Sequence, residues 1–180
     1  MKVILFLLLY IPNLFASLKN DTSYLFSVNL NIPVFGEFGD RKNGFKETYG
    51  FNLSVLKNYD DLISYGFIVS QSFYYKNRNV DLKFRIFSFT PAIFGFIDIE
   101  KKYYFYIGAG IYHWSQPSST YNSTSGDEGG FRVGFGYKKI YKKIGYGSGI
   151  EFNHLFNING KNFDLGPSNI LSFYINISVD

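Results

Sequence analysis

His154 is the residue whose surroundings come nearest to a catalytic site in this chain. It lies in the segment Glu-Phe-Asn-His-Leu-Phe-Asn, residues 151–157. Acyl transfer needs a hydroxyl nucleophile beside a histidine base. Residues 151–157 hold no Ser or Thr. His154 is therefore a weak catalytic candidate, and we expect no catalytic centre.

Four charged residues fall on the polar faces of predicted strands: Lys83, Arg85, Arg132 and Glu151, with Asp81 near one end. An enclosed charge without a partner is costly. We therefore expect these four side chains to form an ion-paired network in the interior. Arg132 and Glu151 lie on adjacent predicted strands and are the expected pair.

Metal and cofactor chemistry is not indicated. The chain has no cysteine, which excludes a thiolate zinc site, a thiol nucleophile and a disulfide framework. Its two histidines, His113 and His154, are isolated from each other in the sequence and make no metal site. The net charge of +4 is spread along the chain with no basic block, so we expect no nucleic-acid partner.

The elements that carry these residues are predicted strands. From about residue 22 onward apolar and polar residues alternate with period two, and Gly, Asn, Asp and Ser clusters separate the runs. Eight runs of about ten residues result, with no long amphipathic helix pattern. Their apolar faces include Phe26 to Ile32, Tyr49 to Val55, Ile63 to Val69, Val80 to Ile86, Phe105 to Ile111, Phe131 to Tyr137, Tyr146 to Phe152 and Leu171 to Val179.

The run at residues 80–99 is irregular. Leu82, Phe84 and Ile86 share one face, but the alternation is lost between Phe87 and Pro91. Proline cannot donate to a strand ladder, so we expect a bulge there. The segment forms either one long strand or two shorter ones.

The two faces of these runs differ in composition. The polar faces are mostly Gly, Ser, Asn and Thr, which fit the narrow interior of an eight-stranded barrel. The apolar faces carry Phe, Tyr, Leu, Ile and Val with few charges, as lipid requires. Aromatics at the ends of runs are expected to form interface girdles; they are Phe73, Tyr74, Tyr75, Tyr103, Tyr104, Tyr112, Trp114, Tyr137, Phe152 and Phe156. A soluble periplasmic β-barrel binding protein is the alternative.

Long and short connections alternate along the chain. Residues 34–44, 115–129 and 157–168 are long links, whereas residues 57–61, 100–102 and 138–143 are short. Transmembrane barrels have short periplasmic turns and longer outer loops. The polar loop Ser115 to Gly129 is the expected site for an extracellular ligand.

The N-terminus predicts export. Met1-Lys2 is followed by an apolar run from Val3 to Tyr10, which is too short to span a bilayer as a helix. Ala16 and Ser17 offer a cleavage point. We expect residues 1–17 to be a signal peptide and residues 18–180 an outer-membrane β-barrel domain.

Two segments carry a resemblance to a known group of proteins: Tyr-Ile-Gly-Ala-Gly-Ile-Tyr at 106–112 and Gly-Phe-Arg-Val-Gly-Phe-Gly-Tyr at 130–137. With the alternating C-terminal run they resemble small outer-membrane β-barrel proteins of the OmpA/OmpX-like superfamily. The resemblance implies an all-β, closed, antiparallel up-and-down transmembrane barrel of about eight strands. Such barrels usually end in an aromatic residue, whereas this chain ends in Asp180.

Residues 151–168 have a weaker resemblance to lipid A 3-O-deacylase barrels, which carry a His-x-Ser-Asn motif. His154 and Asn157 match, but Phe156 stands at the serine position and the position of the orienting carboxylate falls near Ser168. The alternative function is therefore a lipid A-modifying barrel enzyme that has lost its catalytic set.

The sequence predicts a protein of the bacterial outer membrane with a structural or surface-interaction role carried by its extracellular loops. The expected partners are outer-membrane lipid and the barrel-assembly machinery. No cofactor is expected, and we expect a monomer.

Overall fold

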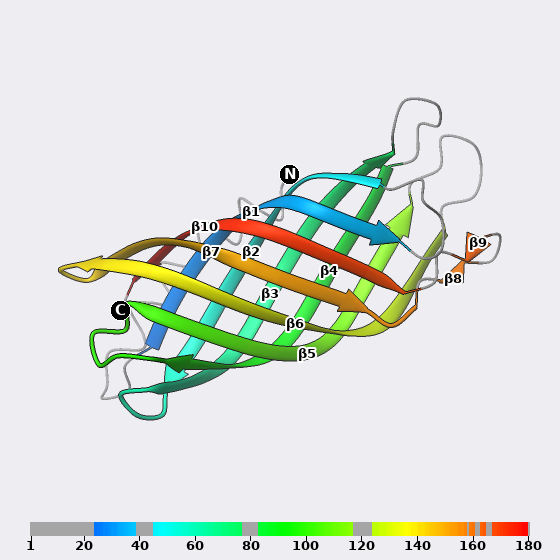
Figure 1. Cartoon of the computed structure of the whole chain (residues 1–180). Coiled ribbons are helices and arrows are strands. Elements are labelled where there is room, and N and C mark those ends of the chain that lie inside the picture. Colours follow the sequence, from blue (N-terminus) through cyan, green and yellow to red (C-terminus); the bar gives the residue numbers. More distant parts are fainter. Residues whose placement is uncertain are drawn as a thin grey trace, which may run out of the picture.

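Eight long strands form the barrel of the computed structural model (Figure 1). The structure describes residues 24–38, 45–76, 83–116, 124–157, 159–160, 163–164 and 167–179. The side chains of 33, 35–38, 45–48, 74–76, 83–84, 116, 124, 159–160 and 163–164 are outside that description. The barrel strands are β1 (Tyr24–Phe38), β2 (Phe45–Asn58), β3 (Ile63–Lys76), β4 (Lys83–Phe96), β5 (Tyr103–Gln116), β6 (Thr124–Tyr141), β7 (Ile144–Leu155) and β10 (Ser168–Val179).

Each strand pairs antiparallel with its neighbours in the chain, and β1 closes the barrel against β10. Closure pairs Phe26 with Val179 at one end and Phe38 with Ser168 at the other. The ladders shift register between Pro33 and Phe35 and between Glu47 and Tyr49. The closed ring leaves no unpaired sheet edge, which satisfies the condition for a sheet in lipid. The predicted fold class is confirmed.

Side chains sort to the two faces of the wall by strand parity. Val28, Phe67, Ile107 and Ile175 point outward and are 53%, 49%, 55% and 49% exposed. They come from β1, β3, β5 and β10, so the apolar exterior surrounds the barrel. Arg132 and Glu151 point inward and are each 1% exposed. The exterior is therefore apolar, whereas the interior holds the buried charges and polar groups beside a cluster of apolar side chains.

Glycines on the inner face make room for large inner side chains. A Cβ on Gly134 would lie 2.2 Å from the ring of Tyr106, and one on Gly136 would lie 2.4 Å from the hydroxyl of Tyr174. The buried rings of Tyr104, Tyr106 and Tyr174 therefore occupy the space that these glycines leave. The lumen is filled by side chains, as expected for eight strands.

The prediction of which side chains of β4 point outward is wrong. Ile86 points inward and is 4% exposed, whereas Arg85 and Phe87 are exposed. The pairing with β3 runs without a register shift from Ile63–Gly95 to Tyr75–Lys83, so no bulge occurs at Pro91 and residues 83–96 form one strand. Pro91 lies outward, and the β4–β5 ladder skips Thr90 and Pro91. The missing N–H is therefore accommodated without an extra residue.

The girdle prediction is wrong for three aromatics. Tyr104, Tyr112 and Trp114 are buried in the lumen. Tyr103, Tyr137 and Phe156 are exposed, and Phe73 and Phe152 are partly exposed. The side chains of Tyr74 and Tyr75 lie outside the described residues. The physical reason is parity, because neighbouring residues of a strand cannot both face the lipid.

Three short turns lie together at one end of the barrel, at residues 59–62, 97–102 and 142–143, and β10 ends there too (Figure 1). The opposite end carries the small hairpin of β8 (Asn159–Gly160) and β9 (Phe163–Asp164), which the sequence did not predict. The links predicted at 34–44 and 115–129 are shorter than expected because the strands continue into them. Within Ser115 to Gly129, for example, Ser115 pairs with Ser125.

The part of the chain that the structure describes contains no helix long and apolar enough to cross a membrane.

Candidate functional site

The centre of the lumen holds one carboxylate, Glu151 of β7. Asn31 Nδ2 donates to its Oε1 at 3.0 Å, and Asn153 Nδ2 donates to the same oxygen at 2.7 Å. Asn52 Nδ2 donates to Oε2 at 3.1 Å. The hydroxyl of Tyr106 also donates to Oε2, at 2.5 Å. Four neutral donors from β1, β2, β5 and β7 therefore converge on this carboxylate.

Arg132 of β6 supplies the opposite charge. Its Nη1 lies 3.4 Å from Glu151 Oε2, and its Nη2 donates to Ser88 Oγ at 2.5 Å and to Ser70 Oγ at 2.9 Å. Its guanidinium also lies 5.7 Å from the ring centroid of Tyr112. Arg132 thereby links the carboxylate to β3 and β4. Together the two charges join side chains from seven of the eight barrel strands.

The space left in the lumen is small. A cavity of about 10 Å³ lies beside Glu151 and Tyr112, and one of about 20 Å³ lies beside Lys138 and Phe96. A single water needs roughly 10–15 Å³ by the same measure. The central layer of charged and polar groups therefore neutralises itself and closes the lumen to anything larger than water.

Lys138 of β6 is a third buried charge, and it was not among the residues predicted to lie in the lumen. It lies toward the short-turn end, with Nζ 5.5 Å from the ring centroid of Phe96. Residues 138–143 were expected to form a turn, but β6 continues to Tyr141. Extending the parity of Arg132, Gly134 and Gly136 by one step would have predicted that Lys138 points inward.

One residue of the expected network, Arg85, does not join it. Arg85 is exposed on the outer face, where its guanidinium lies 5.9 Å from the ring centroid of Phe73. The reason is the shifted face of β4, which puts Ser88 rather than Arg85 toward the lumen. The backbone of Lys83 begins β4, but its side chain lies outside the described residues, and Asp81 is outside them altogether.

Outward charges sit near strand ends. Arg85 and Asp127 lie near the end with the long links, and Lys57 and Lys139 near the short turns. Asp127 Oδ1 accepts a hydrogen bond from His113 Nδ1 at 2.7 Å. A charge near the interface costs far less than one at the bilayer midplane. The outer face therefore has the charge distribution of a wall that passes through hydrocarbon.

His154 lies on the outer face near the long-link end. Its Nδ1 is 2.8 Å from Asn169 Oδ1, and its ring stands 5.1 Å from Phe131 and 5.6 Å from Phe156. Ser168 is fully buried on the inner face and pairs with Leu155 across the β7–β10 ladder. Ser168 and His154 therefore lie on opposite faces of the barrel wall, because strand parity directs one side chain inward and the other outward.

No group of three or more metal-binding side chains occurs among the residues that the structure describes.

The barrel and its filled lumen have the fold of small eight-stranded outer-membrane β-barrels. Neisserial surface protein A superposes with a TM-score of 0.57 at 14% identity, over 89% of this chain and 99% of that one. Ail, the attachment invasion locus protein of Yersinia pestis, gives 0.50 at 16%, over 87% and 96%. The predicted resemblance is therefore confirmed at the level of fold. No protein-family model matches the chain, and no curated protein matches it.

Proposed function

We propose that this chain is an integral barrel of the bacterial outer membrane that acts in surface interaction through the links at its long-link end. One observation carries the membrane assignment. The exterior is apolar on all sides between charged strand ends, while the polar residues are enclosed. A soluble periplasmic barrel would need the opposite arrangement, with polar groups facing water.

The surface role is supported by the filled lumen and by the names of structurally similar proteins. Seven strands are tied together through Glu151 and Arg132, so the lumen offers no passage, which leaves the links between the strands as the place for a ligand to bind. Ail is an attachment protein by name, and neisserial surface protein A is a surface protein by name. The predicted loop Ser115 to Gly129 would meet an extracellular ligand. Residues 117–123 are the part of this loop between the end of β5 and the start of β6.

Two experiments test this function in sequence. The first compares boiled and unboiled protein on a gel after membrane fractionation. A folded membrane barrel stays with the outer membrane and changes mobility on boiling. Extraction into buffer without detergent, with no mobility change, would contradict the membrane assignment.

The second experiment measures adhesion of intact cells that express the protein to a cultured epithelial layer. Replacing 117–123 with Asn-Gly, which closes a tight hairpin, should lower adhesion at least about tenfold, or roughly 1.4 kcal/mol if adhesion follows a single binding equilibrium. The matched control replaces Lys142-Lys143, in the short turn at the other end, with the same dipeptide. Unchanged adhesion in the first variant would contradict the surface role.

We infer that His154 has no catalytic role and that the lipid A-modifying alternative does not apply. Its hydrogen-bond partner is an amide, and Ser168 faces the lumen. The purified barrel should release no acyl chain from lipid A, and His154→Ala should leave that result unchanged. Release that disappears in His154→Ala would establish the enzyme instead.

We also propose that residues 1–17 are removed during export, although they lie outside the described residues. Protein isolated from the outer membrane should begin at or near residue 18 by N-terminal sequencing. A mature protein that begins at Met1 would contradict the signal peptide.

A further inference from the structure

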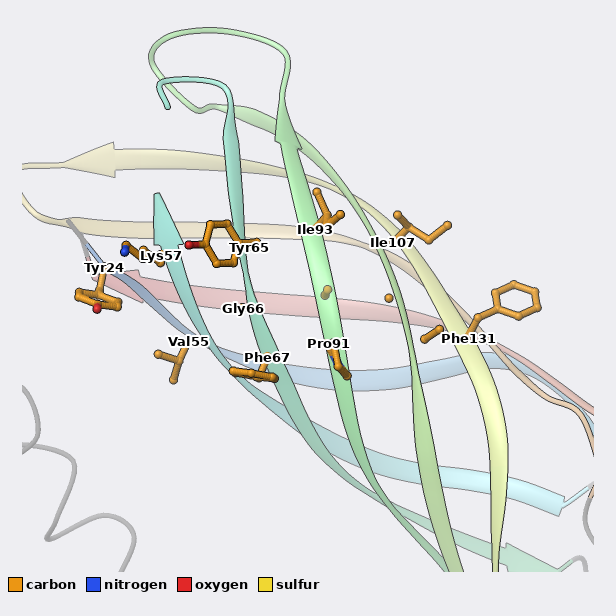
Figure 2. A pocket seen from close by; sticks show the side chains of 13 residues that line it. Tyr24, Val55, Lys57, Tyr65, Gly66, Phe67, Pro91, Ile93, Ile107 and Phe131 are labelled. Carbon is orange, nitrogen blue, oxygen red and sulfur yellow. The ribbon is translucent and has the colours of Figure 1, made fainter. Parts of the chain in front are cut away.

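The outer wall carries a groove of about 710 Å³ that extends from the start of β1 across β2, β3, β4 and β5 to β6 (Figure 2). We call it the wall groove. Outward-facing Phe67, Ile93 and Ile107 line it and are about half exposed. In a membrane barrel this surface meets acyl chains, so the wall groove is a recess on the lipid-facing side.

Small residues create the recess. On the inner face Gly66 pairs with Ala92, and Ala92 pairs with Gly108. A Cβ on Gly66 would lie 2.0 Å from the carbonyl oxygen of Val55, so β2 and β3 approach closely here. On the outer face Pro91 and Ala109 provide small side chains between larger ones. The recess therefore exists because the residues at this height of the barrel wall have small side chains.

One end of the wall groove carries a positive charge. Lys57 pairs with Tyr24 on one side and with Tyr65 on the other, and Figure 2 shows its ammonium between the two tyrosines. Among the described residues that line the groove, Lys57 alone is charged. It lies one residue before the end of β2 and the turn 59–62, at the short-turn end. Tyr and Lys at this level are typical of the membrane interface.

We propose that the wall groove binds one anionic glycerophospholipid from the leaflet at the short-turn end, with its phosphate on Lys57 and an acyl chain along Phe67, Pro91 and Ile107. The apolar lining takes up the hydrocarbon, and the single cation at the interface end matches the single anionic headgroup. This lipid site rests on the proposed membrane location and adds a specific ligand to it.

The test is native mass spectrometry of the delipidated barrel, mixed in detergent with equal amounts of dioleoyl phosphatidylglycerol and dioleoyl phosphatidylcholine. The wild-type barrel should retain one lipid and prefer the phosphatidylglycerol. Lys57→Gln should lower that preference about fivefold, because a basic residue near a membrane surface contributes about 1 kcal/mol. Ala109→Phe fills the recess with apolar volume and should reduce retention of both lipids.

Matched variants separate the site from general effects. Lys143→Gln removes a cation at the same end but outside the wall groove, and Ile175→Phe enlarges an outward residue on β10; both should behave as the wild type.

Each variant is first checked for heat-modifiable mobility. Equal retention of both lipids by a heat-modifiable wild-type barrel overturns the lipid site alone, whereas a wild type without that mobility overturns the membrane barrel and the lipid site with it. A dimer that Ala109→Phe abolishes would assign the groove to a second copy of the chain and overturn the proposal.

Discussion

At the scale of single residues, the centre of the barrel depends on Glu151 and Arg132. Both are 1% exposed, and four neutral donors and one guanidinium surround the carboxylate. Burying such a pair carries a large desolvation cost, which the hydrogen bonds offset. The pair therefore matters most when one member is removed, because the other charge then stays buried without compensation.

Glu151→Gln should destabilise the folded barrel by about 3–5 kcal/mol. The amide keeps the shape but leaves Arg132 as an uncompensated charge. Urea unfolding in phospholipid vesicles measures this, with the fluorescence of Trp114, the single tryptophan, as the signal. The matched control, Asp127→Asn, changes an exposed carboxylate and should cost about 0–1 kcal/mol.

The double variant Glu151→Gln, Arg132→Met should recover part of that loss, because neither member of the pair then remains as a charge without its partner. The free energy of unfolding of the single variant Arg132→Met is measured as well. If the losses of the two single variants add up to the loss of the double variant, the two residues do not interact and the energetic role of the pair is wrong.

Tyr106→Phe should cost about 1.5–3 kcal/mol, because it removes a hydrogen bond to a buried carboxylate while keeping the ring. The same unfolding measurement applies. Tyr103→Phe, on the outer face of the same strand, is the control and should stay within about 0.5 kcal/mol.

At the scale of strands, the inner face is a set of matched large and small residues. Gly134 of β6 stands against Tyr106 of β5, and Gly136 stands against Tyr104 and Tyr174. Gly134 and Gly136 both belong to β6, so this strand leaves room for inner rings of β5 and β10. A larger side chain there must displace an aromatic ring that is already hydrogen-bonded.

Gly134→Ala should therefore cost about 1–3 kcal/mol by overpacking, since its Cβ would lie 2.2 Å from the ring of Tyr106. Gly129→Ala, on the outer face of β6, places its Cβ 3.1 Å from Phe156, an exposed ring that can move aside. This control should stay within about 0.5 kcal/mol. Equal losses in the two variants would mean that the effect comes from strand glycines in general rather than from the contact with Tyr106.

At the scale of the whole molecule, the exterior forms a belt that is apolar between two charged ends. Ile107 lies in that belt, whereas Tyr141 lies beside the turn at residues 142–143. The strands have 12 to 18 residues, more than the 9–11 or so that a tilted strand needs to cross a bilayer. Their ends therefore extend into water, and outward charges such as Arg85 are tolerated there.

Ile107→Lys should destabilise the inserted barrel by about 2–4 kcal/mol, and Tyr141→Lys by about 0–1 kcal/mol. Unfolding from phospholipid vesicles gives both values. Similar costs at the two positions would contradict the placement of the belt, because a lysine should cost more near the bilayer midplane than at the interface.

Alternation along the chain was enough to predict the number of barrel strands and, for seven of them, the face that each presents to lipid. Side-chain direction in a strand has period two, so residues such as Leu171 to Val179 carry this information locally. The same alternation put Arg132 and Glu151 inside. The prediction failed in β4, because Phe84 and Ile86 on one face and Phe87 and Phe89 on the other are all apolar. Alternation there does not distinguish the lipid-facing side from the inner side.

Contacts across the lumen could not be predicted from the pattern. Asn31 and Glu151 are 120 residues apart and meet because β1 closes against β10. Tyr106 and Glu151 are 45 residues apart and meet across Gly134, which pairs with both of them in the ladders of β5, β6 and β7. The registers of β3, β4 and β5 likewise line up Gly66, Ala92 and Gly108 at the wall groove. Alternation acts between neighbours in one strand, whereas these pairings depend on the register of every strand between them, and register is a property of the closed barrel.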